Sequence, residues 1–212
     1  MTDRATFIGR VRDRIADRGK TSVDIPSDWM PTIEDPVARF ELEVTAVGGT
    51  FHAATPASAG SVLAGILADL DGPSVVVTRE EAVPATVPDA ITATGAELLW
   101  WPEAGRERTA TITVGVTAAE WAVAETGTVL ISSAPPGGRA PSLLTQVHVA
   151  FVSVDRLLPT VADLFRRIAE MPTRPSNLVL VTGPSKTADI ENVLVRGVHG
   201  PGDLHVVLVG PD

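Results

Sequence analysis

The sequence predicts an α/β protein: a single-domain sheet of mostly parallel strands with helices on both faces. Helical and strand-like patterns alternate along the chain, as they do in layered α/β folds. Several strand-like runs are continuously apolar, as at 75–77, which is typical of strands covered on both faces. The 212 residues are 44% hydrophobic, enough for one substantial core, and contain no convincing interdomain linker.

The elements are expected in a simple order. Residues 1–35 form a helical lead-in and loop, with an amphipathic helix at 4–18 that packs either on the body or on a partner. Residues 36–212 complete the one domain as its α/β body. Further helices are expected at 36–47, 57–70 and 155–169. Strands are expected at 50–53, 74–78, 98–101, 110–116, 127–132, 147–153, 178–182 and 204–209.

Composition restricts the classes of partner. The chain has 17 basic and 26 acidic side chains, so 17 − 26 = −9, a charge that repels nucleic acid and anionic lipid. It has no cysteine, and therefore no disulfide, thiolate metal site or cysteine-ligated iron–sulfur cluster. We find neither a signal-peptide core nor a run of 18 apolar residues. We expect a cytoplasmic protein without a bound cofactor.

Ligands of open α/β sheets bind beyond the carboxyl ends of strands, so the residues that follow strand-like runs are the candidates. The first segment, 118–128, predicts a short helix, a glycine turn at Gly127 and then a buried strand. Glu125 and Thr126 would lie at the turn with Thr128 beside it, where a carboxylate and hydroxyls can face a ligand. Alternatively, Gly127 ends a helix and Glu125 is solvated.

The second segment, 132–142, contains hydroxyls, two glycines and Arg139. Arg139 can bind a carboxylate or phosphate through two parallel hydrogen bonds. Turn formation alone also explains its Pro-Pro-Gly-Gly sequence.

The third segment, 178–191, predicts a buried strand that ends at Gly183 and a helix that begins near Thr187. Free amides at that helix, together with a hydroxyl and the Lys186 ammonium, would bind an anion. A plain capped helix is the alternative, with Ser185 or Thr187 as the cap and Asp189 in the first turn. A phosphate-binding P-loop is excluded, because it needs glycine at 180 and 185.

The four histidines are too scattered for a metal-ligand signature. His199 is the strongest functional candidate, because it lies in the loop Gly-Val-His-Gly-Pro-Gly, where an imidazole can act as acid or base. A loop histidine that only bonds the backbone is the alternative.

Three motifs together resemble the LUD-domain family, and within it the lactate-utilisation protein C group. They are Ala-Glu-Thr-Gly-Thr at 124–128, Gly-Pro-Ser-Lys-Thr-Ala-Asp-Ile-Glu at 183–191 and Gly-Val-His-Gly-Pro at 197–201. The resemblance covers roughly residues 109–210. One departure is the segment 143–147, which lacks the expected Pro-Asp-like pair, so the resemblance assigns no role to His148.

The resemblance implies a fold similar to that of glucosamine-phosphate deaminases, ribose-phosphate isomerases and CoA transferases. It also implies a place in a three-protein system that oxidises L-lactate to pyruvate, with iron–sulfur protein subunits as partners. Two functions follow as hypotheses. One is an accessory subunit that binds a small anion or partner subunits. The other is a stand-alone enzyme acting on a small carboxylated, phosphorylated or CoA-linked substrate, with Glu125 as base or nucleophile and His199 assisting.

Overall fold

The structure is a computed structural model that describes residues 3–16, 31–78, 83–133, 139–188 and 194–211. It divides the chain into two units, residues 1–30 and 31–212. The described part of the first unit contains α1 (Arg4–Ala16), an amphipathic helix without a buried residue. Its apolar side chains Phe7 and Ile15 are exposed. The second unit is an α/β body.

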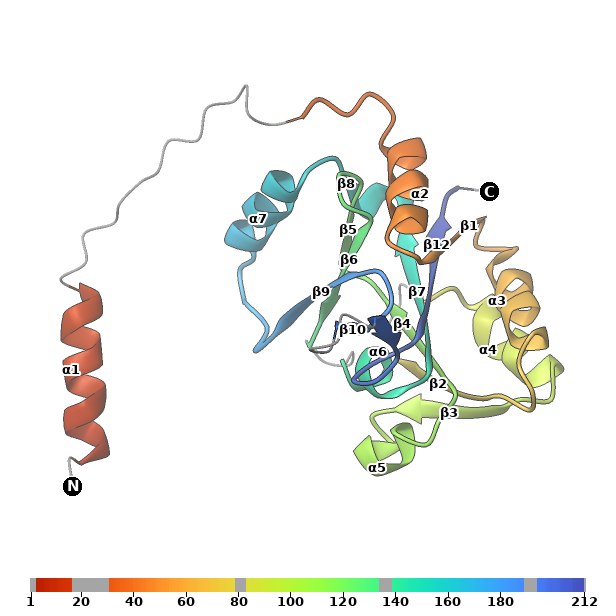
Figure 1. Ribbon diagram of the computed structural model, residues 1–212, viewed down its shortest axis with the longest axis horizontal. Coiled ribbons are helices and arrows are strands. Elements are labelled where there is room, and N and C mark those ends of the chain that lie inside the picture. The colour runs from red at the N-terminus through yellow and green to blue at the C-terminus, as the bar shows by residue number, and fades with distance from the viewer. Residues whose placement is uncertain (1–2, 17–30, 79–82, 134–138, 189–193, 212) are drawn as a thin grey trace. The chain divides into compact units, whose positions relative to one another are not determined.

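A parallel sheet is the centre of the body (Figure 1). Among the described residues it has six strands, and every neighbouring pair is parallel. In spatial order they are β1 (Thr50–Ala54), β12 (Asp203–Val209), β7 (Val147–Ser153), β4 (Val114–Ala118), β2 (Ser74–Thr78) and β3 (Glu97–Trp101). The predicted fold class, an α/β sheet of mostly parallel strands with helices, is confirmed.

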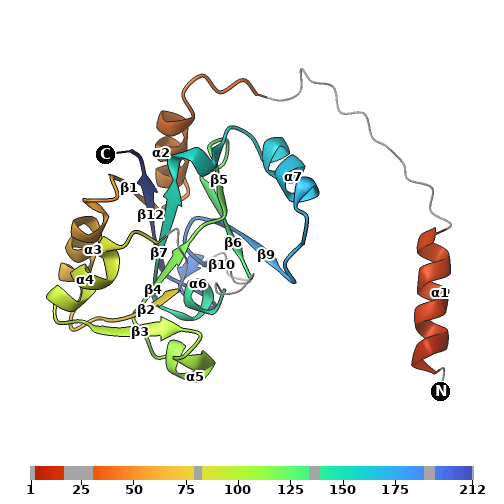
Figure 2. The same cartoon turned by 180° about the vertical axis from the view of Figure 1, so that it is seen from behind.

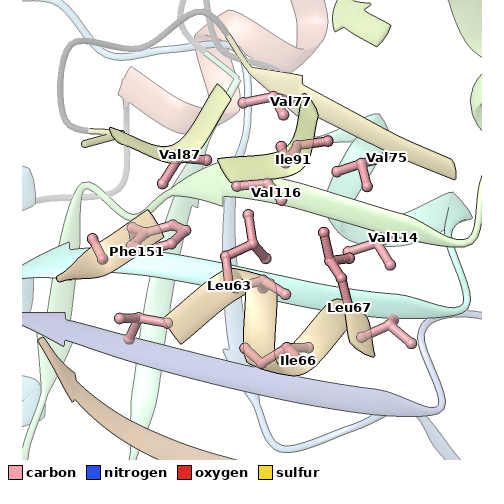
Figure 3. Packing of buried hydrophobic residues seen from close by; sticks show 14 of the residues in the cluster. Leu63, Ile66, Leu67, Val75, Val77, Val87, Ile91, Val114, Val116 and Phe151 are labelled. Carbon is pink, nitrogen blue, oxygen red and sulfur yellow. The ribbon is translucent and has the colours of Figure 1, made fainter. Parts of the chain in front are cut away.

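Two helices, α3 (Ala59–Ala68) and α4 (Thr86–Ala93), cover one face of this sheet. Leu63 and Leu67 from α3 and Ile91 from α4 meet valines of the strands and Phe151 from β7 (Figure 3). These side chains are almost completely buried. The apolar strand runs of the sequence therefore supply one wall of the core, as their pattern indicates.

The other face of the sheet is covered by α2 (Pro36–Ala46) and by a second, four-stranded sheet. Asp35 caps α2 by accepting hydrogen bonds from the amides of Val37 and Ala38. Phe40 and Val44 on the inner side of α2 are fully buried. The strands of the second sheet, in order, are β8 (Leu157–Leu158), β5 (Trp121–Val123), β6 (Thr128–Ser132) and β9 (Leu178–Thr182).

The outer face of the second sheet packs against α7 (Val161–Glu170) through Leu130, Leu158 and Leu164. Thr160 starts α7 with a capping box, in which Thr160 and Asp163 bond each other's backbone amides. The layers of the body are thus α3 and α4, the parallel sheet, α2 with the second sheet, and α7 (Figure 1). The short elements are α5 (Gly105–Thr109), α6 (Ala140–Leu144), a 3₁₀ turn (Val154–Arg156), β10 (Lys186–Ala188) and β11 (Leu194–Arg196).

The structure corrects several expected elements. The expected strands at 127–132 and 178–182 do not join the parallel strands in a single sheet, because they pair with each other in the four-stranded sheet. The helix expected from 118 is the strand β5, whose residues alternate between the two cores: Ala122 faces the parallel sheet and Val123 faces α7. Burial of alternate side chains on opposite sides favours a strand over a helix in this stretch.

The starts of two elements and the type of a third also differ. The strand expected at 110–116 begins only at Val114, because Thr109 and Thr111 hydroxyls bond nearby helix carbonyls and complete α5. The helix expected at 155–169 begins at Val161, after the Thr160 cap. The helix expected near Thr187 is the strand β10, which pairs antiparallel with β11.

Candidate functional site

A pocket of about 230 Å³ lies at the amino-terminal end of the parallel sheet. His148 and Leu204, each the second residue of its strand, form one wall. Residues 179–185, from β9 and the turn after it, form another, and the loop at 199–201 closes a third side. We expected a site at the carboxyl ends of the strands. This pocket lies at the amino-terminal ends of the strands instead, because β9 belongs to the second sheet and ends near the start of β12.

His148 is the most deeply buried polar residue of the pocket wall, with 1% of its surface exposed. Its Nε2 lies 2.9 Å from the Thr117 hydroxyl of the adjacent strand β4. Its Nδ1 has no hydrogen-bond partner among the described residues. Burial lowers the pKa of His148 to about 3, so the imidazole is neutral at physiological pH. The unpartnered Nδ1 is thus an uncharged, buried nitrogen of a residue in the pocket wall.

Backbone hydrogen bonds bring two of the sequence motifs together beside His148. The Ser185 amide donates to the Pro201 carbonyl at 2.8 Å, and the Gly197 amide donates to the Ser185 carbonyl at 3.0 Å. Ser185 and His199 therefore line the same pocket, together with Gly183. His199 is exposed and Ser185 is partly buried. The structure thus brings residues of the second and third motifs to one pocket, and the roles predicted for them stay predictions.

The motif at 124–128 connects to this pocket through hydroxyl groups. The Thr128 hydroxyl lies 2.7 Å from that of Thr126 and 2.8 Å from that of Thr182, which lines the pocket. Gly127 between them has a φ of 63°. A Cβ at Gly127 would lie 2.5 Å from the amide nitrogen of Val44 in α2. Close packing of the turn on α2 explains why glycine occupies this position.

The two predicted charged residues lie at helix ends. Glu125 accepts a hydrogen bond from the amide of Val161, the first residue of α7, at 2.9 Å. Lys186 donates to the carbonyl of Val47, the residue that ends α2, at 2.5 Å. The helix dipole stabilises a carboxylate at a helix N-terminus and an ammonium at a helix C-terminus. Neither residue, although both are described, lines the His148 pocket.

The remaining predicted residues lie elsewhere. Thr187 is in β10, opposite Val195, so the anion site predicted at a helix N-terminus there is wrong. Asp189 lies outside the described residues. Arg139 precedes α6 and lines a separate pocket with Trp101 and Arg106.

The described ranges contain no group of three or more histidine, cysteine, aspartate or glutamate side chains placed to hold a metal ion. None of their helices has both the length and the apolar character needed to cross a membrane.

Sequence reasoning missed the contribution of the sheet itself, namely His148 and Leu204. A histidine inside the apolar run at 147–153 is a signal of a buried imidazole, and that signal was available. Leu204 carries no such signal, because the pocket is formed by strand order and not by spacing along the chain. Ser142, from the second candidate segment, lines the pocket from α6.

Comparison with known proteins gives a consistent answer. Residues 37–209 match the family model of the LUD domain. "Lactate utilization protein C" of Exiguobacterium sp. is 32% identical over 146 residues, which cover 65% of this chain and 62% of that protein. The protein of the same name in Bacillus subtilis is 42% identical over 100 residues, 45% of this chain and 42% of the relative.

These two matches therefore span less than two thirds of each relative. A similar fold occurs in a DUF162 family protein from Deinococcus radiodurans, with a TM-score of 0.64 and 22% identity. The match covers 85% of this chain and all of that one, and at this identity it concerns the fold alone. The family match over residues 37–209 shows that the chain belongs to the LUD domain family.

Proposed function

We propose that the protein is an accessory subunit of a cytoplasmic bacterial system that oxidises L-lactate to pyruvate, with iron–sulfur proteins as partners. The observation that carries the proposal is the LUD family match, together with relatives named lactate utilization protein C. The assignment comes from the family, since one fold supports many chemistries.

The chemistry of the chain supports an accessory role. Oxidation of lactate to pyruvate removes two electrons and two protons from the substrate, and these electrons must pass to an acceptor. The 212 residues contain no cysteine and so provide no cysteine ligand for an iron–sulfur cluster. In the proposed system the electron carriers belong to partner subunits.

The His148 pocket is the proposed place for a small ligand. The His199 imidazole and the Ser185 hydroxyl can donate hydrogen bonds to a small carboxylate, and His148 adds an uncharged nitrogen in the interior. No lysine or arginine is among the described residues that line it, so an anion would gain little electrostatic attraction. Weak and reversible binding, as suits an accessory or sensing role, is what this lining favours.

The stand-alone enzyme with Glu125 as base gains no support from the geometry. The Glu125 carboxylate bonds the first amide of α7 and does not line the pocket that contains Ser185 and His199. A general base must be within hydrogen-bond reach of the proton that it removes. Capping of α7 is a sufficient reason for a carboxylate at position 125.

The experiment that tests the proposal is affinity purification of the tagged full-length chain from its native cytoplasm. Iron content and lactate-dependent dye reduction are measured on the eluate, and the gene is deleted in parallel. We expect iron–sulfur proteins to copurify and lactate-dependent growth to be lost on deletion. A chain that purifies alone, from a strain whose deletion mutant grows normally on lactate, would overturn the subunit assignment.

Variants of the pocket separate ligand binding from partner binding. Ser185→Ala and His199→Asn are expected to leave copurification unchanged and to lower the dye-reduction rate of the complex. Loss of copurification in both variants would instead place a partner contact at this surface and contradict a ligand-binding role for the pocket.

A further inference from the structure

A second pocket, of about 410 Å³, lies beside the parallel sheet near its β3 edge. Trp101 ends β3, and Arg106 belongs to the adjacent α5 (Figure 2). Arg139 at the start of α6 and Ser133 after β6 complete its polar lining. This volume is within the range of small-molecule sites and exceeds that of the His148 pocket.

The pocket concentrates positive charge in an acidic protein. Two arginines line it, and no aspartate or glutamate is among the described residues that line it. The net charge of the whole chain is −9. Two guanidinium groups that share a pocket repel each other, and a bound anion removes that repulsion.

These two arginines differ from others in the body. Five arginines in the described residues form ion pairs with carboxylates: Arg39, Arg108, Arg156, Arg166 and Arg167. No ion pair is found for Arg106 or Arg139 within the described ranges. Arg108, two residues along α5, pairs with Glu97, whereas Arg106 lines the pocket. Arg139 gives α6 no side-chain cap. Ion pairing and helix capping within the described residues therefore do not explain why an arginine occupies either position.

The rest of the lining is apolar and includes an aromatic ring. Trp101 is partly buried, and Ala140, Leu143 and Leu144 of α6 also face the pocket. Indole rings stack on flat aromatic groups, and nucleobases of every type offer such a face. Guanidinium groups bind phosphate through paired hydrogen bonds. One cavity thus joins a phosphate-binding pair to a stacking surface.

We propose that this pocket binds a nucleoside monophosphate, or the nucleoside-phosphate end of a larger nucleotide, with the phosphate between Arg106 and Arg139 and the base against Trp101. The site is separate from the His148 pocket, and the proposal does not depend on the function proposed above. Leu143 lines both pockets, so a ligand in one contacts a wall of the other.

The test is calorimetric titration of the full-length protein with each of the four ribonucleoside monophosphates, with adenosine and inorganic phosphate as partial ligands. We expect at least one nucleotide to bind more tightly than either partial ligand. Arg106→Gln and Arg139→Gln should each weaken that binding by about tenfold or more, the usual effect of losing a charged hydrogen bond. Trp101→Leu should weaken nucleotide binding and leave the affinity for inorganic phosphate unchanged.

Arg174→Gln is the matched control, because Arg174 is also exposed and does not line this pocket. It should bind the nucleotide as the unaltered protein does. Circular dichroism of each variant checks that the fold is intact. The proposal is overturned if no nucleotide binds at about 1 mM, if phosphate alone binds as tightly as the nucleotides, or if Arg106→Gln and Arg174→Gln have equal affinity.

Discussion

The imidazole of His148 is neutral because it is buried, and this should make stability depend on pH. Its pKa of about 3 in the folded protein lies below the ordinary value of 6.5, so the unfolded chain binds the proton more readily. The contribution is complete above pH 6.5 and is lost progressively as the pH falls towards 3. Between about pH 7.5 and pH 5 the free energy of unfolding should fall by about 2 kcal/mol from this group alone.

Urea unfolding at both pH values measures this loss. Burial also lowers the pKa values of His52 and His205, which add a slope of the same sign, so the comparison is with His148→Gln. The variant should show the smaller loss, by about 2 kcal/mol. Equal losses in both proteins would mean that position 148 is not a buried neutral imidazole.

Gly127 has two reasons to be glycine, its positive φ and its contact with α2, and they can be separated. Gly72 also has a positive φ, of 54°, but a Cβ there would meet nothing within 4 Å. Gly72→Ala should therefore cost about 1 kcal/mol, from backbone strain alone. Gly127→Ala should cost at least about 3 kcal/mol, because the methyl group also displaces α2. Chemical denaturation of both variants measures the difference, and similar losses would rule out the close packing on α2.

Glu125 is expected to act on stability and not on chemistry. Glu125→Gln keeps an oxygen that can accept from the Val161 amide, whereas Glu125→Ala leaves that amide without its cap. The alanine variant should lose about 1 kcal/mol of stability and the glutamine variant clearly less. Lactate-dependent dye reduction by a complex that contains Glu125→Gln should remain at the unaltered rate. A large fall in that rate, with stability retained, would restore the enzyme hypothesis.

At the scale of elements, the end of α2 is a test of helix electrostatics. No basic residue lies in the last turn of α2, and Lys186 from β10 supplies a cation to its final carbonyl. Lys186→Met should lower the free energy of unfolding by about 0.5 kcal/mol at low salt, and by less in about 1 M salt. Arg174→Met, at an exposed site away from helix ends, is the control. It should leave the free energy of unfolding unchanged at both salt concentrations. A salt-independent loss would show that packing, and not charge, is the main contribution.

The sequence predicts the elements well where pattern and environment agree. The run at 74–78 is β2 to the residue, and Pro36 after Asp35 marks the start of α2. Prediction fails where a short strand is buried on both sides, as in β5, and where a cap determines a boundary, as at Thr160. The Thr160 capping signal was present in the sequence. The sequence carries no signal that the strands divide between the parallel sheet and the second sheet, because continuous apolar runs do not reveal which strands pair.

The candidate site shows the same limit. Gly183, Ser185 and His199 line one pocket because backbone hydrogen bonds join their loops, and the order of their motifs along the sequence indicated only the family resemblance. Glu125 and Lys186 follow strands as the others do, yet they are bound at the ends of α7 and α2. Local spacing identifies residues that follow the end of a strand. Which pocket these residues line depends on how the two sheets are arranged in space.

For the whole body, the shared core between the two sheets predicts a single unfolding transition. Phe40 and Val44 of α2 pack in one cluster with Val129 of the second sheet and Val206 of the parallel sheet. Neither sheet can separate without exposing this cluster to water. We therefore expect both sheets to unfold together.

Tryptophan fluorescence can follow each sheet separately. A variant that keeps only Trp100 reports on the parallel sheet, and one that keeps only Trp121 reports on the second sheet, with the other tryptophans changed to phenylalanine. The two urea midpoints, each compared with that of the same variant by circular dichroism, should coincide. A transition at lower urea for Trp121 alone would show that the second sheet unfolds independently.

The position of β12 between β1 and β7 has a consequence for biosynthesis. Among the described residues β1 pairs with β12 alone, and β12 is the last of the six parallel strands to be translated. While the ribosome is still adding residues before 203, the nascent chain has β1 without a neighbour and β7 with an open edge. The sheet can close only when residues 203–209 have left the ribosomal tunnel, so for most of its synthesis the chain carries apolar strand edges of the kind that chaperones protect.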